Sequence, residues 1–568
     1  MALRLLSAPY LPKLSSPASS GRVHCSVSTQ VSHTQRGRRS ANYQPTVWTH
    51  DYLQSLLADE SRQSHLAVEL QREEAQMVEE EVRSALHDEN AEPITIFALV
   101  DDIQRLGLGR HLEEDISRAL HRRLSTDVVN ESLQKSLHGT ALSFRILRQH
   151  GFEVSQGMLS LCEASHLAFE EEDILHEAKT FAIEHLENLH CDINKDLQGE
   201  VTHELELPRH HRTLLLEARR FIEACSRCRY MSHRILKFSA TNFNTLQSIL
   251  QGDLQEMLRW WNNVSLANKL NFVRDRLVEC FFAAVAVADE PTLSNCRKGL
   301  TKVNTLNVII DDVYDIYGTL DELELFTDAV RRWDINAVED LPGYMKLCFL
   351  ALYNSVNEMA YDTLKETGEN VIPHLTKAWY DCCKAFLQEA KWSHNKITPR
   401  IEEYLNNGWI SVSGPLMLIH AYFLSSPSMR KEELASLEHY HDLLRLPSMI
   451  FRLTNDLATS SAELQRGETT NSIRCYMQEM GVSELEARKY VIKLIDTTWK
   501  KLNKYLVNDS TFNQSFVRMA FNLARMAHCV YRDGDAVGAP NDLSKNRVHS
   551  LIINPVSLEP SLDGGILT

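Results

Sequence analysis

The stretch VIIDDVYDIYG, residues 308–318, places three aspartates in an otherwise apolar segment. At about 100° per residue, Asp311 and Asp315 share one face of a helix, and Asp312 lies one step round it. Like charges at that spacing repel, and a carboxylate is costly to bury without a partner. A solvated acidic face would avoid this cost, but the apolar flanks argue against it. Divalent cations such as Mg²⁺, bridging to phosphate oxygens, are the natural partners for these carboxylates.

The sequence around this stretch is helical in pattern. Segments such as 69–86 and 174–189 repeat apolar residues at i, i+3, i+4 and i+7, and no sustained period of two is present. We therefore expect an all-α fold. A chain of 568 residues exceeds what one hydrophobic core supports, which predicts at least two domains. We place the boundary near residue 260, which gives an N-terminal helical domain, 38–260, and a C-terminal one, 261–568.

Composition limits the partners of the chain. The net charge of −16 argues against a nucleic-acid surface and is compatible with bound cations. The longest apolar run, Cys280–Ala288, is too short to span a bilayer, which takes about 20 residues. The 12 cysteines show no zinc-ligand spacing, so we expect them to be reduced and mostly buried. These features predict a soluble protein that binds neither nucleic acid nor membrane.

The first 50 residues differ from the rest because they contain no Asp or Glu, although the chain has 76 acidic residues. They are rich in serine and arginine. Such a leader is typical of an organelle transit peptide, which we place at residues 1–37. A disordered basic tail is the alternative.

A second set of oxygen ligands lies in RLTNDLATSSAEL, residues 452–464. Asn455, Thr459 and Glu463 follow one another at intervals of four, so an amide, a hydroxyl and a carboxylate line one stripe of a helix. Alone this pattern is weak, because it arises by chance in polar helices. Beside the aspartates it predicts a second metal-binding wall.

Three arginines complete the candidate site. Arg274 and Arg276 precede an apolar helix, and Arg452 lies one turn before Asn455. Guanidinium groups suit the paired oxygens of a diphosphate. Each arginine singly could form an ordinary surface ion pair. Together with two sets of metal ligands, they indicate a diphosphate held by metals and arginines.

These motifs resemble those of the class I terpene synthases. DDVYD (311–315) matches the DDxxD motif of that family, NDLATSSAE (455–463) matches its NSE/DTE motif, and RRSANYQPTVW (38–48) matches the RRx8W motif of the plant monoterpene synthase branch. The resemblance extends over roughly residues 38–560. It is strongest to the plastid group that includes ocimene, myrcene and isoprene synthases.

The resemblance implies an N-terminal α-barrel that is a catalytically silent relic and a C-terminal isoprenoid-synthase bundle that carries the active site. It implies three Mg²⁺ or Mn²⁺ ions held by the two ligand sets, with the three arginines sharing the charge of the diphosphate. Tyr531 and Asp535 belong to a segment that closes the pocket in the family. They are candidates for lid or base, although an ordinary surface turn is equally compatible. The nearest match to the class II DxDD motif, LVDD (99–102), lacks its first aspartate, so cyclisation started by protonation is not expected.

The implied activity is that of a lyase that ionises a prenyl diphosphate in the plastid stroma. We expect geranyl diphosphate as substrate and an acyclic olefin of the ocimene or myrcene type as product. The alternatives are isoprene formation from dimethylallyl diphosphate, a cyclic monoterpene or sesquiterpene synthase, and an impaired protein that only binds prenyl diphosphate. We expect a monomer or a weak homodimer.

Four departures limit the resemblance. Ala283 stands where many relatives carry a pocket-wall tryptophan, and Asn471 stands where a lysine is common. TNFNTLQ (241–247) lacks the aspartate of the usual L-D-x-N segment. Around residues 151–161, relatives generally carry roughly twenty more residues, a difference that bears on stability more than on chemistry.

Overall fold

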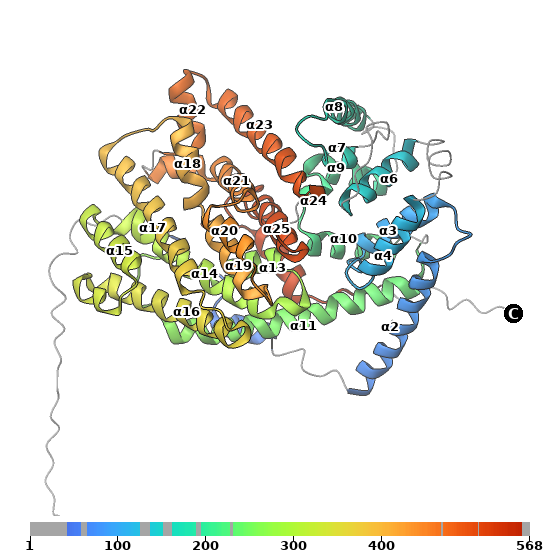
Figure 1. Cartoon of the computed structure of the whole chain (residues 1–568), viewed down its shortest axis with the longest axis horizontal. Coiled ribbons are helices and arrows are strands. Elements are labelled where there is room, and N and C mark those ends of the chain that lie inside the picture. Colours follow the sequence, from blue (N-terminus) through green and yellow to red (C-terminus); the bar gives the residue numbers. More distant parts are fainter. Residues whose placement is uncertain are drawn as a thin grey trace, which may run out of the picture. The chain divides into compact units, whose positions relative to one another are not determined.

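The computed structural model is helical throughout the part of the chain that it describes (Figure 1). This part comprises residues 43–57, 65–124, 137–150, 162–188, 195–227, 231–466, 470–508 and 511–558. No β-strand occurs within these ranges, so the predicted all-α class is confirmed. The predicted leader, the arginine pair at 38–39 and the shortened segment at 151–161 lie outside the described residues.

The first half of the chain, blue to green in Figure 1, consists mainly of helices of moderate length. They are α1 (His50–Leu57), α2 (His65–Leu86), α3 (Pro93–Arg105), α4 (Glu113–Leu124), α6 (Leu137–Gln149), α7 (Cys162–Ser165), α8 (Asp173–Asn188), α9 (Lys195–Glu206), η2 (Arg209–His211), α10 (Leu214–Arg227) and the long α11 (His233–Val264).

The second half, green to red, is a bundle of longer helices. They are α12 (Leu266–Lys269), α13 (Leu277–Val287), η3 (Pro291–Leu293), α14 (Ser294–Asp312), η4 (Val313–Tyr317), α15 (Leu320–Arg332), η5 (Ile335–Asp340), α16 (Gly343–Thr367), α17 (Ile372–Asn395), α18 (Ile401–Ser411), α19 (Gly414–Ser425), α20 (Lys431–Glu438), α21 (Asp442–Arg466), α22 (Ser472–Met480), α23 (Glu484–Asn503), α24 (Tyr505–Asn508), α25 (Gln514–Tyr531), α26 (Asp542–Val548) and η6 (His549–Ile553).

Helix α13 lies at the centre of the bundle. Every one of its residues is buried, and it packs against α11, α14 and α25. Helix α21, which carries the second ligand set, packs against α19, α23 and α25. Both α13 and α21 pack on α25. Helix α25 therefore connects α13, which follows Arg274 and Arg276, with α21, which carries Arg452.

Helix α11 joins the two halves. It contacts α2 and α10 from the first half and α13, α14 and η6 from the second. The predicted domain boundary near residue 260 falls inside this continuous helix. All described residues belong to one compact unit, so the division into two domains stays a prediction.

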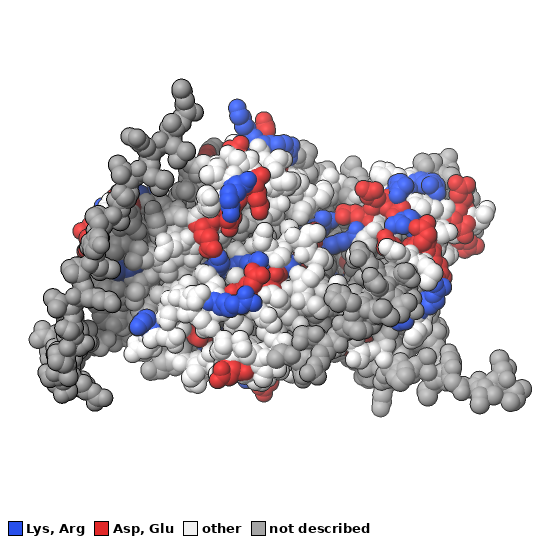
Figure 2. Space-filling model, turned by 90° about the horizontal axis from the view of Figure 1, so that it is seen from below, with Lys and Arg blue, Asp and Glu red and all other residues white. Residues whose placement is uncertain are grey.

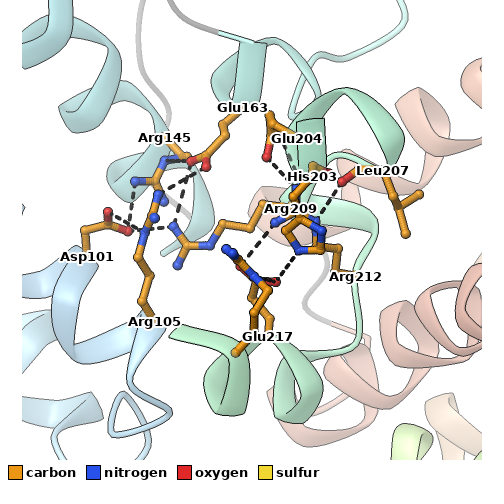
Figure 3. Close-up of polar contacts among 11 residues, drawn as sticks. Asp101, Arg105, Arg145, Glu163, His203, Glu204, Leu207, Arg209, Arg212 and Glu217 are labelled. Carbon is orange, nitrogen blue, oxygen red and sulfur yellow. Dashed lines mark hydrogen bonds and ion pairs between the residues drawn. The ribbon is translucent and has the colours of Figure 1, made fainter. Parts of the chain in front are cut away.

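A buried network of ion pairs holds the N-terminal helices together (Figure 3). Arg145 on α6 contacts Asp101 Oδ1 at 2.8 Å and Glu163 Oε2 at 3.0 Å. Arg105 and Arg209 bind the same two acids, with Arg209 Nη1 at 2.7 Å from Asp101 Oδ1. The network therefore fastens α6 to α7, the two helices on either side of residues 151–161. Charged hydrogen bonds of this kind are strong where water is excluded.

This network also determines the chemistry of the LVDD segment. Burial works to raise the pKa of Asp101, but the charges of Arg209, Arg145 and Arg105 hold it well below its usual value. Asp101 is therefore a carboxylate at neutral pH and cannot act as a proton donor. Burial and the charge of Asp101 raise the pKa of the neighbouring Asp102, so the expectation that no protonation starts at this segment still rests on the missing first aspartate.

On the face shown in Figure 2, acidic and basic side chains lie beside one another rather than in a patch of one sign. Among the described helices, none combines the length and the apolar character that a membrane crossing requires. No disulfide joins the cysteines whose side chains are described, and most of them are buried.

A stack of buried histidines joins helices from the two halves of the chain. The ring of His211 stacks on Trp499 with centroids 4.2 Å apart, and it lies parallel to the ring of His528 at 5.4 Å. His210 Nε2 bonds to Asn503 Oδ1 at 2.9 Å, and His166 packs edge-on against His211. Burial lowers the pKa of all four histidines, to about 3 for His210 and about 4 for His528. The folded protein therefore contains them as neutral rings.

We predict that this histidine stack makes the fold sensitive to acid. Below about pH 6.5 the unfolded chain takes up protons that the buried rings cannot accept, so stability falls as pH falls from about 6.5 to about 4. Each histidine contributes a slope of about 1.4 kcal/mol per pH unit. The measurement is the free energy of unfolding in urea at pH 7.5, 6.5 and 5.5.

His211→Phe is the informative variant, because it keeps the ring on Trp499 and removes one proton-binding group. We expect its stability to fall less steeply with pH, by about the slope of one histidine. An unchanged slope would show that the stack does not control the acid sensitivity.

Candidate active site

The first wall of the site is the end of α14. Asp311 and Asp312 are its last residues, and Asp315 lies in η4, a turn of π-helix in which the Gly318 N–H donates to Val313 O at 2.8 Å. The structure thus differs from the regular α-helix assumed in the sequence analysis, because the wider turn changes the direction in which Asp315 projects. Such turns occur frequently at functional sites.

Arg274 neutralises this wall. Its Nη2 lies 2.6 Å from Asp311 Oδ2, its Nε lies 2.8 Å from Asp312 Oδ1, and its backbone N–H donates to Asp312 Oδ2 at 2.7 Å. Asp312 is fully buried, and this burial raises its pKa to about 6 in spite of Arg274. One arginine therefore does not fully compensate the buried carboxylates, which favours further positive charge at this point.

Tyr43, which the sequence analysis did not single out, also lies at this wall. The Arg274 guanidinium carbon stands 4.9 Å from the centre of its ring. Burial raises the pKa of Tyr43, and the charges of Asp312, Asp311 and Asp315 raise it further, although Arg274 opposes them. Tyr43 is thus a neutral phenol beside all three aspartates. Its place inside RRSANYQPTVW was the signal that could have identified it.

The second wall is formed by α21. Arg452 Nη2 contacts Asn455 Oδ1 and lies 2.6 Å from Asp456 Oδ1, and the Thr459 hydroxyl donates to Asn455 O at 3.0 Å. Glu463 belongs to the same helix, but its side chain is not among those described. The predicted stripe is therefore present in the backbone, and two of its three side chains are placed.

Asp456, which was not predicted, supports this wall. It is fully buried, accepts a hydrogen bond from the Tyr404 hydroxyl at 2.9 Å and another from the Ser472 N–H at 2.9 Å, and pairs with Arg452. Asn471, where relatives commonly carry lysine, accepts from the Arg474 N–H at 3.0 Å and so caps α22. At this position the chain has a structural cap in place of a basic side chain.

Glu389 on α17 is influenced by acids of both walls. Its Oε1 accepts hydrogen bonds from the Ser411 hydroxyl at 2.6 Å and from Asn407 Nδ2 at 3.2 Å. Burial raises its pKa to about 7, and the charges of both Asp311 and Asp456 contribute, with Arg452 opposing. Since the charges of α14 and α21 both act on this one carboxyl group, the ends of the two helices that carry these acids lie near Glu389. A carboxyl group at this place is a further candidate oxygen ligand for a cation.

Tyr531 and Asp535 lie near the arginines of the site. Burial and the charge of Asp535 raise the pKa of Tyr531, while Arg274 and Arg452 lower it, so the phenol lies near both arginines. Asp535 also acts on Arg274, and its Oδ1 accepts the N–H groups of residues 537 and 538 at 3.0 and 2.8 Å. Asp535 therefore shapes the loop after α25 as well as facing the site.

Arg274 contacts the aspartates of α14 and Arg452 contacts Asp456 of α21, whereas Arg276 pairs with no acid among the described side chains of either wall. Its guanidinium is buried and donates to backbone carbonyl groups. Ala283 is buried on α13, the helix that begins directly after Arg276. Sequence spacing alone could not distinguish the role of Arg276 from that of Arg274. One residue separates the two, and their side chains have different partners because the backbone changes direction at the start of α13.

The oxygen ligands fit a hard divalent cation. Asp312 is a buried carboxylate with only partial compensation, and α14 and α21 supply carboxylate, amide and hydroxyl oxygens, the ligand types that such cations prefer. Within the described ranges, no three His, Cys, Asp or Glu side chains form a ready-made metal cluster. Arg274 contacts both Asp311 and Asp312, and the second ligand set consists mainly of neutral oxygens, those of Asn455 and Thr459. Three acidic side chains therefore do not form a group by themselves in the described part of the site.

Comparisons with known proteins show the family to which the chain belongs. Residues 47–157 match the family model of the terpene synthase N-terminal domain, and residues 262–501 match that of the terpene synthase family metal-binding domain. The chain is 51% identical over 562 residues to a chloroplastic isoprene synthase of Populus tremuloides, covering 94% of this chain and 93% of that protein. It is 44% identical to a chloroplastic myrcene synthase of Quercus ilex, with 94% and 93% covered.

A solved structure of isoprene synthase from grey poplar, in complex with three Mg²⁺ ions and dimethylallyl-S-thiolodiphosphate, is 50% identical and superposes with a TM-score of 0.83, covering 90% of this chain and 100% of that one. The chain therefore belongs to the terpene synthase family. It is a metal-binding lyase that releases diphosphate from a prenyl diphosphate.

We predict that Asp312→Asn abolishes turnover and leaves the fold intact. The amide keeps the shape of the buried side chain and removes a carboxylate that is costly to bury. The loss of one metal ligand removes several kcal/mol of stabilisation, so we expect a drop in kcat of about a thousandfold or more. Diphosphate release and thermal unfolding are the two measurements. Asp321→Asn, an exposed acid at the start of α15, is the control.

Glu463→Ala tests the second wall by a separate measurement. We expect it to raise the Mg²⁺ concentration needed for half-maximal activity or to abolish activity. Wild-type turnover in Asp312→Asn, or wild-type Mg²⁺ dependence in Glu463→Ala, would contradict the assignment of that wall.

Proposed function

We propose that the chain converts geranyl diphosphate to an acyclic monoterpene of the myrcene or ocimene type in the plastid. The observation that supports this proposal is that acids of both α14 and α21 act on Glu389, while Arg274 pairs with Asp311 and Asp312 and Arg452 pairs with Asp456. A group of carboxylates and arginines suits the diphosphate end of a substrate with its metals, and the apolar helix α13, which begins just after Arg274 and Arg276, suits an apolar chain.

The ligands for the metals would be Asp311, Asp312 and Asp315 on one wall and Asn455, Thr459 and Glu463 on the other, with Glu389 as a further candidate. Three Mg²⁺ or Mn²⁺ ions, the number in the grey poplar structure, would neutralise the diphosphate as it leaves. Arg274 and Arg452 share that task, because each lies within reach of one wall and of Tyr531.

After ionisation, apolar and aromatic side chains around the substrate hold the allylic cation away from water. The ring of Phe451 lies 5.9 Å from that of Tyr531, which presents two aromatic faces to a cation. Tyr531 is a neutral phenol, because burial raises its pKa, so it acts as part of the wall and not as an anionic base. We assign the acceptance of the final proton to Asp535.

Isoprene formation from dimethylallyl diphosphate is the second candidate. Its support is the similarity to isoprene synthases of Populus at about 50% identity, which exceeds the 44% identity to the myrcene synthase. The names of these relatives include the word chloroplastic, and together with the acid-free leader they support a plastid location. The stroma and the oligomeric state stay predictions.

One experiment decides between the substrates. The purified protein with Mg²⁺ is given geranyl, dimethylallyl and farnesyl diphosphate in separate reactions, and volatile products are identified by gas chromatography. We expect myrcene or ocimene from geranyl diphosphate with the highest kcat/KM. A higher kcat/KM for dimethylallyl diphosphate would transfer the assignment to isoprene synthase, and absence of diphosphate release with all three would refute both.

We predict that Ala283 favours acyclic products. A tryptophan at this position would add a π-face worth about 0.5–2 kcal/mol to a nearby cation, enough to change partitioning about tenfold. Ala283→Trp should therefore increase the cyclic fraction from geranyl diphosphate. Ala283→Leu is the matched control, since it fills volume without a π-face. An equal effect of both variants would assign the change to volume alone.

A further inference from the structure

Arg488 on α23 binds helix α21 inside the stretch that carries the second ligand set. Its Nη1 donates to Leu457 O at 2.9 Å, and its Nη2 donates to the Ser460 hydroxyl at 2.7 Å. Both acceptors lie between Asn455 and Glu463 in the chain. One guanidinium group therefore attaches to α21 at two points among the predicted metal ligands.

The bonds of Arg488 reach α21 from outside the stripe of ligands. At about 100° per residue, Leu457 lies about 160° round the helix from Thr459, the middle ligand, and Ser460 lies about 100° round from it. Ser460 is buried, and the Thr459 hydroxyl donates within its own helix, to Asn455 O. Arg488 therefore binds sides of α21 other than the one that carries the ligands.

A third bond fixes the guanidinium group itself. Its Nε donates to Glu484 Oε1 at 2.8 Å, one turn earlier on α23. Helix α23 begins at Glu484, and Ser483 and Glu486 form a capping box there. The side chain of Arg488 is only 28% exposed. All three of its nitrogens have an acceptor, and the planar fork of an arginine allows the two bonds to α21 at once.

The end of α21 is where such a hold matters. The helix ends three residues after Glu463, and the last turn of a helix lacks intrahelical partners for its carbonyl groups. On another side of α21, Asp456 accepts hydrogen bonds from the Tyr404 hydroxyl of α18 and from the Ser472 N–H at the start of α22. Arg488 adds an attachment from α23. Two attachments on different sides together define the rotation of α21 about its axis.

We propose that Arg488 is a positioning residue that fixes the rotation of α21, so that the second ligand set holds its metal ions together with a diphosphate. This inference rests on the proposed function, which assigns Asn455, Thr459 and Glu463 as ligands. A turn of only about 5° moves a side-chain oxygen that lies about 5 Å from the helix axis by about 0.4 Å. Metal–oxygen distances tolerate only about 0.2 Å, so a small rotation is enough to weaken the site.

Metal binding by the full chain measures this role without turnover. Mn²⁺ is titrated into the protein in the presence of inorganic diphosphate, well below the unfolding temperature, and free Mn²⁺ is followed by electron paramagnetic resonance. We expect Arg488→Lys to raise the Mn²⁺ dissociation constant about fivefold to tenfold, because one ammonium group cannot make both bonds to α21. Ser460→Ala leaves the arginine in place and removes one acceptor, so we expect a rise of about twofold to threefold.

Kinetics with geranyl diphosphate separate this role from two others. Arg488→Lys should raise the Mg²⁺ concentration for half-maximal activity by the same factor and leave the KM for geranyl diphosphate at saturating Mg²⁺ unchanged. A residue that only stabilises the fold would lower the unfolding temperature and leave the Mn²⁺ affinity at the wild-type value. A residue that contacts the diphosphate would raise the KM even at saturating Mg²⁺. Either of these results would overturn the proposal.

Glu484→Gln is the matched control, because it changes the bond within α23 and leaves both bonds of Arg488 to α21. The side chain of Glu484 is 56% exposed, and an exposed ion pair contributes little to stability. We expect wild-type Mn²⁺ affinity in this variant. A loss equal to that of Arg488→Lys would show that any disturbance of α23 weakens metal binding, and would overturn the specific role.

A double variant tests whether Arg488 acts through the ligand helix. In the Thr459→Ala background one ligand is already lost, so the addition of Arg488→Lys should weaken Mn²⁺ binding by a smaller factor than in the wild type. Two factors that multiply in full would contradict the proposal.

The two proposals fail in different ways. Absence of product from every prenyl diphosphate would refute the proposed function and leave the Mn²⁺ titration as the test of positioning. Absence of Mn²⁺ binding by the wild-type protein with inorganic diphosphate would overturn the inference itself.

Discussion

The arrangement of the site depends on the cost of burying carboxylates at the end of α14. Asp312 is fully buried, and Arg274 contacts it and Asp311 with both its side chain and its backbone. Since burial still raises the pKa of Asp312 to about 6, this compensation is partial. Three further groups lie near that charge: Tyr43 before α1, Asp535 after α25, and Glu389 on α17.

Arg274 and Arg276 are two residues apart and have different partners. The first is bound to carboxylates and the second to carbonyl groups. Arg276 is the N-cap of α13, and its backbone (φ −135°, ψ 34°) is neither extended nor helical. This change of direction separates the two guanidinium groups. Three residues, Arg274 to Arg276, thus contact both the aspartates at the end of α14 and the backbone of residues 44, 537 and 538.

The N-terminal helices use charge in a different way. Three arginines surround Asp101 and Glu163, and the resulting network connects α3, α6, α7 and η2 (Figure 3). Breaking one member of such a buried network leaves the others uncompensated, so the network fixes the relative positions of these helices. The stacking of His211 on Trp499 and the ion pair of Lys179 with Asp496 then connect these early helices to α23.

The sequence by itself determined the helical class and predicted the two ligand sets with Arg274 and Arg452, because periodicity and spacing of three or four residues are properties of a single helix. It also drew attention to Tyr531 and Asp535 through motif order. It did not indicate the π-helical turn at Asp315, the cap at Asn471, or the roles of Tyr43, Glu389 and Asp456. Those features come from contacts between residues that are far apart in the chain, such as Arg276 with Gln44 and Val537. Only the tertiary structure could decide them, since the partner of a buried charge depends on which helices pack against it.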